Sequence, residues 1–226
     1  MQIDEIFEAD KRIKKKKRTT PLLNSPFLDE IADRQIFIKA ECLQHTGSFK
    51  FRGAYSAISS IPIEKRQKGV IAYSSGNHAQ GVAFAAKIHK IPATIVMPED
   101  APKIKINNTR DLGAEVILYD RLSENREKIG QKISEERLLS LIPPYDHNDV
   151  IAGQGTIGLE IANQAEQIGV GKADVLVCCG GGGLTSGIAV ALSSLMPDFV
   201  TRPVEPEGFD DVCLLYTSDA ADEVRR

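Results

Sequence analysis

The sequence has few cysteines, no long apolar run and almost no excess of either charge. Its four cysteines, two of them adjacent, argue against a disulfide framework or a spaced zinc site and fit a reducing compartment. No apolar stretch reaches the roughly 20 residues of a membrane span, and no signal-peptide core is present. The chain is therefore predicted to be cytoplasmic and not to bind a membrane. With 28 basic and 31 acidic residues, its charge is too balanced for a protein that binds nucleic acid.

The sequence does have enough apolar residues for a sizeable core and a regular alternation of patterns. Hydrophobic residues make up 42% of 226 residues, as expected for a folded enzyme-sized unit. Short apolar runs predict strands at residues 36–40, 70–73, 93–97, 115–119, 174–179 and 200–205. Amphipathic stretches predict helices around residues 51–58, 79–86, 157–168 and 184–195.

Strands that alternate with helices predict an α/β fold with parallel sheets and helices on both faces. Gly153 and Gly155 follow the connection at Pro143 and Pro144, and we expect them to open a helix. Ligands of parallel sheets bind at the carboxyl ends of the strands. Functional residues are therefore expected in the loops after the strands.

Basic residues are concentrated near the N-terminus, unlike in the rest of the chain. Residues 11–18 contain seven basic residues in eight, and acidic residues precede them. Ile3, Ile6 and Phe7 can share one face of a short helix. We interpret the segment as a solvated terminal helix, with a nuclear-localisation or phosphate-binding patch as the alternative.

Lys50 lies in the predicted first turn of a helix. The positive end of a helix dipole disfavours an ammonium and favours anions, so a neutral amine beside a phosphate costs less there. Such a site suits a lysine that forms a Schiff base. The alternative is a surface lysine on an ordinary turn.

A polar loop, residues 74–78, separates the strand at 70–73 from the next helix. Capping that helix requires one polar residue, but the loop offers several hydroxyl and amide groups and exposed N–H groups. These groups can hold a carboxylate, although a structural turn remains the alternative. The residues are Ser74, Ser75, Gly76, Asn77 and His78; His78 alone is more typical of a hydrogen bonder at a helix start than of a base.

Four consecutive glycines follow the strand at 174–179 and precede a helix. Glycine lets the backbone approach an anion closely, and the helix N-terminus adds partial positive charge. Neither a GxxxxGK[ST] nor a GxGxxG pattern is present. We therefore predict a phosphate-binding loop at Gly180, Gly181, Gly182 and Gly183, called the glycine loop below.

A phosphate-binding loop, a Schiff-base lysine and a carboxylate loop together describe a site for pyridoxal phosphate and an amino acid. The chain carries KAECLQHTGSFKFRGA at residues 39–54, SSGNHAQG at 74–81, MPEDAPKIKINNTRDLGAEV at 97–116, AGQGTIGLEI at 152–161 and CGGGGL at 179–184. With these motifs in order, the sequence from about Thr20 to Val212 resembles the threonine/serine dehydratase and serine racemase family.

The resemblance implies the fold of fold-type II pyridoxal phosphate enzymes, similar to tryptophan synthase β, and a role for each motif. Lys50 binds the cofactor and removes the Cα proton, Phe49 flanks the cofactor ring, and Asn77 bonds the ring hydroxyl. The glycine loop and Leu184 bind the phosphate. The 74–78 loop holds the substrate carboxylate, and Ser75 matches the serine that faces Cα from the opposite side in racemases.

The implied reaction converts L-threonine or L-serine into 2-oxobutanoate or pyruvate and ammonia. Serine racemase and 3-hydroxyaspartate dehydratase are the alternatives within the family. A non-catalytic phosphate-binding module is the alternative from another class, and an intact Lys50 speaks against it.

The resemblance also implies a divalent cation site at Glu205, Phe209 and Asp211, with the carbonyl oxygen of Phe209 between the two carboxylates. Oxygen ligands suit Mg²⁺, Ca²⁺ or Mn²⁺. An acidic surface turn is the alternative.

The predicted organisation is a large cofactor domain, residues 1–69 and 146–212, that is incomplete, and a small domain, residues 70–145. The peptide CLLYTSDAADE within residues 213–226 looks like translated sequencing adaptor, so we expect the natural protein to continue differently beyond Val212. The family's pyridine-nitrogen contact and usual homodimer belong to that longer form. We expect the 226-residue chain to express poorly or to bind cofactor weakly.

Overall fold

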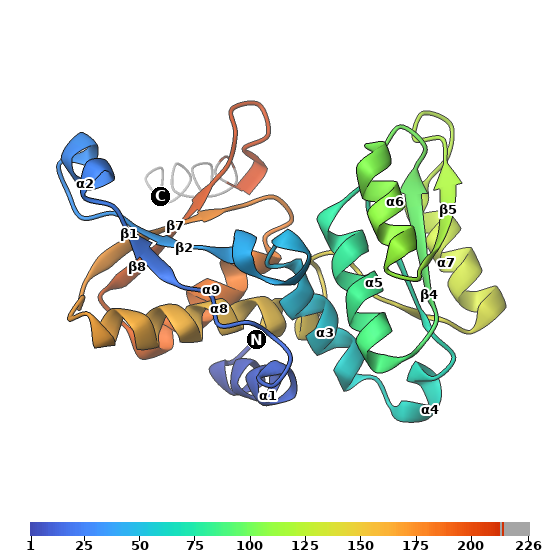
Figure 1. The fold of residues 1–226 in the computed structure, drawn as a ribbon, viewed down its shortest axis with the longest axis horizontal. Helices are drawn as coiled ribbons and strands as arrows, with labels where there is room; N and C mark the ends of the chain where they lie inside the picture. The colour runs from blue at the N-terminus through green and yellow to red at the C-terminus, as the bar shows by residue number, and fades with distance from the viewer. Residues whose placement is uncertain (213, 215–226) are drawn as a thin grey trace, which may run out of the picture.

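The computed structural model describes residues 1–212 and residue 214. Residue 213 and residues 215–226, most of the predicted read-through tail, lie outside the described residues. The elements form two groups that lie side by side, with helix α3 (Lys50–Ser60) between them (Figure 1). None of the described helices is both long and apolar enough to cross a membrane.

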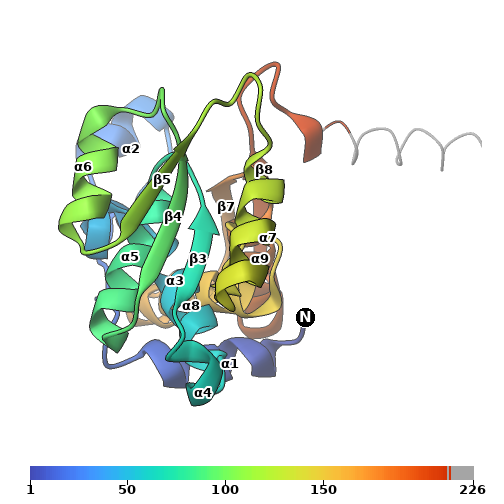
Figure 2. The same ribbon diagram turned by 90° about the vertical axis from the view of Figure 1, so that its right-hand side faces the viewer.

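One group is built on a four-stranded parallel sheet in the order β5-β4-β3-β6. Its strands are β3 (Val70–Tyr73), β4 (Ala93–Pro98), β5 (Glu115–Tyr119) and β6 (Ser140–Leu141). Helices α5 (Asn77–His89) and α6 (Lys103–Asp111) cover one face, and α7 (Arg126–Arg137) covers the other (Figure 2). The sheet falls within the predicted small domain. Strand β4 is buried along its whole length, and burial on both faces explains why Thr94 is its one polar residue.

The other group contains two small sheets and the long helix α8 (Asn148–Gln167). Strands β7 (Ala173–Cys178) and β8 (Phe199–Val204) are parallel, and β1 (Leu22–Asn24) and β2 (Phe37–Lys39) are antiparallel. Helix α9 (Gly183–Leu195) packs against α8. Short helices, α2 (Pro26–Ala32) and α4 (Ile63–Arg66), complete the chain. The parallel pairing in both groups agrees with the predicted α/β fold class.

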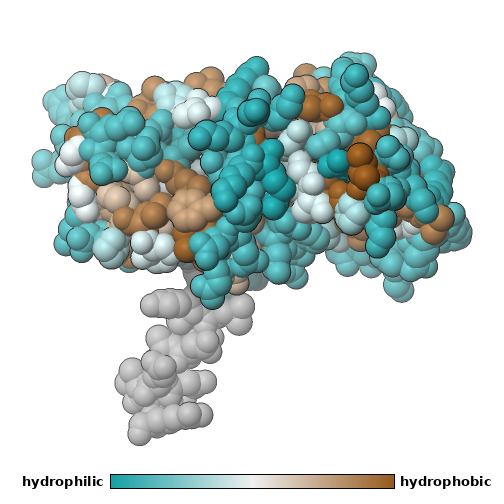
Figure 3. Space-filling view, turned by 90° about the horizontal axis from the view of Figure 1, so that it is seen from below, coloured by the Kyte–Doolittle hydropathy of each residue, from teal (hydrophilic) through white to brown (hydrophobic). Residues whose placement is uncertain are grey.

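The N-terminal helix is solvated on its outer face only, which corrects the interpretation of a solvated helix. Helix α1 (Ile3–Ile13) buries Ile6, Ala9 and Ile13 completely, whereas Phe7 is exposed. Its outer face remains polar, and a hydrophilic band crosses the surface at the position of α1 in the view from below (Figure 3). The prediction was wrong because Ala9 and Ile13 extend the apolar stripe into the charged run, where it is hard to see.

Gly153 and Gly155 do not open a helix, contrary to expectation. They lie inside α8, which begins at Asn148. A Cβ atom on Gly153 would lie 2.7 Å from the carbonyl oxygen of Arg52, and one on Gly155 would lie 2.9 Å from that of Gly187. Glycine is needed at both positions because α8 packs closely on α3 and α9. This packing fixes α3, and with it Lys50, at the boundary between the two groups.

Candidate functional site

Lys50 is the first residue of α3, and its side chain is partly buried. Its Nζ donates a hydrogen bond to the carbonyl oxygen of Pro144 at 2.6 Å and lies 5.2 Å from the centre of the Phe49 ring. Burial lowers the pKa of Lys50 to about 8. A substantial fraction of the amine is therefore neutral near physiological pH, as a nucleophilic or basic lysine requires.

The 74–78 loop connects β3 to α5, and no side chain caps α5. The N-cap residue is Gly76, and the side chains of Ser75 and Asn77 are exposed without a hydrogen bond among the described residues. Ser74 is partly buried, and its Oγ accepts a hydrogen bond from Gly76 N at 3.1 Å. The first N–H groups of α5 thus remain available to an anion.

His78 is buried in the first turn of α5, with 2% of its surface exposed. Its Nε2 lies 2.9 Å from the carbonyl oxygen of Ile142, so Nε2 carries the proton and donates it. Burial lowers the pKa of His78 to about 4, and the ring is neutral at pH 7. Its Nδ1 has no partner among the described residues. The ring therefore ties the 74–78 loop to the chain after β6.

The glycine loop follows β7 and leads into α9, with Gly180 and Gly181 exposed. A Cβ atom on Gly181 would overlap the Tyr145 ring, and one on Gly183 would lie 2.8 Å from the Tyr145 carbonyl oxygen. Gly182 has a φ of 76°, which favours glycine. Gly181, Gly182 and Gly183 therefore accept no side chain without strain or rearrangement, whereas Gly180 has open space around it.

Gly183→Ala is expected to destabilise the cofactor-free chain, because its Cβ meets backbone that cannot rotate away. Overpacking of this kind costs about 1–3 kcal/mol, or roughly 2–10 °C in melting temperature for a chain of this size. Gly180→Ala is the matched control, since a Cβ there meets no atom within 4 Å. Thermal denaturation of both variants tests the contact, and equal melting temperatures would contradict it.

Thr185 and Leu184 follow the glycine loop in the first turn of α9. Leu184 packs against the apolar cluster that α8, α9, β7 and β8 form. The Oγ1 of Thr185 is buried and has no hydrogen-bond partner among the described residues. A hydroxyl at a helix N-terminus can donate to a phosphate, so Thr185 joins the candidate phosphate site. Thr185 was not predicted from the sequence, where the phosphate site was assigned to the glycines and Leu184.

The three predicted elements meet at one segment, Ile142–Tyr145 in chain order. The 74–78 loop contacts Ile142 through His78, Lys50 contacts Pro144, and the glycine loop contacts Tyr145. From the sequence alone, this segment is predicted only as a connection. A signal for it exists, since it follows the short parallel strand β6 and so lies at the carboxyl edge of the sheet.

The residues predicted to bind a cation follow β8, the parallel neighbour of β7. Phe209 is exposed, and its N donates to the carbonyl oxygen of Pro206 at 3.0 Å; Asp211 is also exposed, and Glu205 is partly buried. Across residues 1–212 and 214, no three acidic, histidine or cysteine side chains gather as a metal site. The proposed site needs only two carboxylates and a carbonyl, so it stays a prediction.

The residues present fit pyridoxal phosphate. The glycine loop leaves Gly180 and Gly181 exposed before a helix N-terminus, the Thr185 hydroxyl has no partner among the described residues, and Lys50 provides an amine with a lowered pKa. The Phe49 ring lies beside that amine and offers an apolar surface to an aromatic ring. The glycine loop and Thr185 suit the phosphate of the cofactor, the Lys50 amine suits its aldehyde, and the Phe49 ring suits its aromatic ring.

Comparisons with known proteins agree with this chemistry. L-threo-3-hydroxyaspartate ammonia-lyase of Saccharomyces cerevisiae is 50% identical over 92% of this chain and 62% of its own length. Serine racemase of Schizosaccharomyces pombe is 46% identical over 92% of this chain and 63% of its length. The crystal structure of a threonine deaminase from T.th. superposes with a TM-score of 0.87 and 45% identity, covering 93% of this chain and 67% of that one.

The chain thus spans about three fifths of the length of the curated relatives it matches. Its structural neighbours include threonine deaminase and serine racemase, so the predicted fold-type II architecture is confirmed. Residues 13–225 match the family described as "Pyridoxal-phosphate dependent enzyme". On this match, supported by the geometry of the site, the chain belongs to the family of pyridoxal phosphate-dependent enzymes.

Proposed function

We propose that this protein is an ammonia-lyase that converts a small 3-hydroxy amino acid, L-threonine or L-serine, into a 2-oxo acid and ammonia. The observation that carries the proposal is the convergence of Lys50, the 74–78 loop and the glycine loop on the segment Ile142–Tyr145. It brings an amine of lowered pKa, a carboxylate-binding loop and a phosphate-binding loop to one place.

Each element has a distinct task in the proposed mechanism. The glycine loop and Thr185 hold the phosphate, and the N–H groups at the start of α5 hold the substrate carboxylate. The neutral Lys50 amine takes the proton from Cα, and the ammonium that this forms returns a proton to the β-hydroxyl, which leaves as water. When bound, the cofactor supplies a ring that accepts the electron pair left at Cα. Hydrolysis by water then releases ammonia and the 2-oxo acid.

The second candidate substrate is 3-hydroxyaspartate, since two relatives that are 50% and 48% identical bear the name L-threo-3-hydroxyaspartate ammonia-lyase. Serine racemisation is the third candidate. Ser75 is exposed in the 74–78 loop, where its hydroxyl has no partner among the described residues and is available to carry a proton. The homodimer implied by the resemblance is part of the proposal.

The test is a substrate comparison on the whole protein, expressed from the complete source gene and loaded with pyridoxal phosphate. Release of 2-oxobutanoate, pyruvate and oxaloacetate from L-threonine, L-serine and L-threo-3-hydroxyaspartate is measured, and serine is analysed on a chiral column. We expect 2-oxo acid and ammonia in equal amounts, fastest from threonine or serine. Absence of any 2-oxo acid would overturn the proposal, and D-serine alone would favour the racemase.

Covalent capture of pyridoxal phosphate should become faster as the pH rises from 6 to 8. Only the neutral Lys50 amine is nucleophilic, and its pKa of about 8 makes the neutral fraction grow about tenfold per pH unit below that value. Stopped-flow absorbance of the cofactor-free protein follows the rate. A rate that keeps rising to pH 10, as for an ordinary exposed lysine, would show that burial does not lower this pKa.

A further inference from the structure

Lys105, a residue of α6, lies on the 74–78 loop. A Cβ atom on Gly76 would lie 2.8 Å from the Lys105 Nζ and 3.1 Å from its Cδ. Gly76 is buried, whereas its neighbours Ser75 and Asn77 are exposed. The end of the lysine side chain therefore covers the middle of the loop that is proposed to hold the substrate carboxylate.

Helix stability does not explain a lysine at this position. Lys105 lies in the first turn of α6, where the helix dipole disfavours a cation. The positions three and four residues away on either side are Ala101, Pro102, Asn108 and Thr109, so no acidic side chain can pair with it along the helix. Throughout the described part of the chain, no carboxylate forms an ion pair with Lys105.

The N-terminus of α5 adds partial positive charge at the same loop. Strands β3 and β4 are parallel, so α5 and α6 both begin at the edge where these strands end. The first N–H groups of α5 have no side-chain cap, and they lie directly after Gly76. An unpaired ammonium and a helix N-terminus at the same loop create a local excess of positive charge, which an anion would neutralise.

We propose that Lys105 is a substrate-binding residue whose ammonium pairs with the α-carboxylate of the amino acid at the 74–78 loop. The inference rests on the proposed function and adds a side chain from a second helix to the carboxylate site. The backbone N–H groups of α5 orient the carboxylate, and Lys105 supplies the full charge that they lack.

The experiment measures binding rather than turnover. Calorimetry on the cofactor-loaded whole protein compares L-alanine, which has no β-hydroxyl to lose, with L-alaninamide, which lacks the carboxylate charge. Lys105→Met retains the apolar stem and is expected to weaken L-alanine binding about ten- to a hundredfold, the size of a charge-assisted hydrogen bond. L-Alaninamide binding should change less than about threefold, and Lys105→Arg should restore part of the loss.

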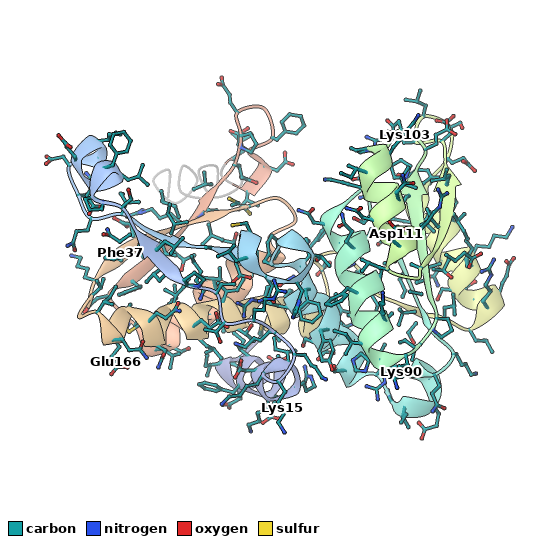
Figure 4. All side chains as sticks on the ribbon, in the orientation of Figure 1. Lys15, Phe37, Lys90, Lys103, Asp111 and Glu166 are labelled. Atoms are coloured by element: carbon teal, nitrogen blue, oxygen red, sulfur yellow. The ribbon has the colours of Figure 1, made fainter. Side chains whose placement is uncertain are left out.

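Lys103→Met is the matched control, because Lys103 is an exposed lysine at the start of the same helix (Figure 4). It should bind L-alanine as the wild type does. The inference, but not the proposed function, would be overturned if Lys105→Met bound L-alanine as tightly as the wild type does, or if it lost equal affinity for L-alanine and L-alaninamide. If Lys105→Met does not load cofactor, Lys105→Gln is measured in its place. A wild type that neither captures cofactor nor forms 2-oxo acid would instead overturn the proposed function.

Discussion

Lys50→Ala is expected to abolish covalent capture of pyridoxal phosphate and to lower turnover at least about a thousandfold. The variant removes both the nucleophile for the cofactor and the base for the Cα proton, and proton transfer by a positioned base alone contributes about 10²–10⁴-fold. The Nζ of Lys50 bonds the carbonyl oxygen of Pro144 in the segment that both loops contact, whereas Lys105 lies at the 74–78 loop alone.

Two measurements check this prediction. Reduction with borohydride followed by mass spectrometry detects the trapped cofactor, and release of 2-oxo acid measures turnover. Lys68→Ala is the matched control, since Lys68 is an exposed lysine that precedes β3 and lies outside the site. A Lys50→Ala protein that still traps one cofactor per chain would refute the assignment of Lys50.

The main elements of the site were predictable because each lies in a loop next to a readable strand or helix. The strands at 70–73 and 115–119 have the predicted bounds, and the other predicted strands differ by one residue at one or both ends. Glycine runs and a lysine in a first helical turn carry local physical meaning that does not depend on the rest of the fold. Sequence therefore suffices to name the glycine loop and Lys50 as candidates.

The contacts that join these elements were not predictable. Lys50 meets Pro144 across 94 residues, and His78 meets Ile142 across 64 residues. Pro144 and Ile142 contribute only carbonyl oxygens, which every residue has, so their side chains carry no signal. Lys105 was missed for a related reason: a lysine is notable only once the loop beneath it and the missing acidic partner are known.

Some helices also escaped the sequence analysis. Helices α6 and α7 are largely polar, and Gly130 is the one residue of α7 that is buried. Only a narrow apolar stripe of each helix faces the sheet, so the helical periodicity of hydrophobic residues in the sequence is weak. The burial of α1 was missed because its charged run hides an amphipathic pattern that depends on partners in α3 and α8.

A buried cluster of charges explains how the N-terminal segment is held against α3 and α8. The guanidinium of Arg52 is fully buried, and it bonds Glu160 at 2.8 Å and Glu41 at 2.7 Å. Glu160 also receives bonds from Lys17 at 2.6 Å and from Lys39 at 2.7 Å. Glu160 thus joins three cations, which come from α3, β2 and the segment after α1. The cation from α3, Arg52, lies two residues after Lys50.

Glu160→Gln is expected to lower the free energy of unfolding by about 3–5 kcal/mol, because it leaves buried cations without their shared counter-charge. This corresponds to a fall of roughly 6–20 °C in melting temperature for a chain of this size. Asp100→Asn is the matched control: it breaks the exposed pair between Asp100 and Arg121 and should cost less than about 1 kcal/mol. Urea denaturation at pH 7 measures both, and an equal effect of the two variants would contradict the role of the cluster.

The difference in free energy of unfolding between the wild type and Glu160→Gln should depend on pH. This dependence distinguishes the loss of the charge from a loss of packing. Burial opposes ionisation of Glu160, but the hydrogen bond and charge of Arg52, with bonds from Lys17 and Lys39, outweigh it and lower the pKa of Glu160 from 4.5 to about 2. A depressed folded-state pKa stabilises the fold by about 3 kcal/mol above pH 4.5, and this contribution disappears as the pH falls through 2. The wild type and Glu160→Gln should therefore differ most above pH 5 and converge toward pH 2. A difference that stays constant across this range would mean that the glutamine packs poorly and that the charge of Glu160 contributes little.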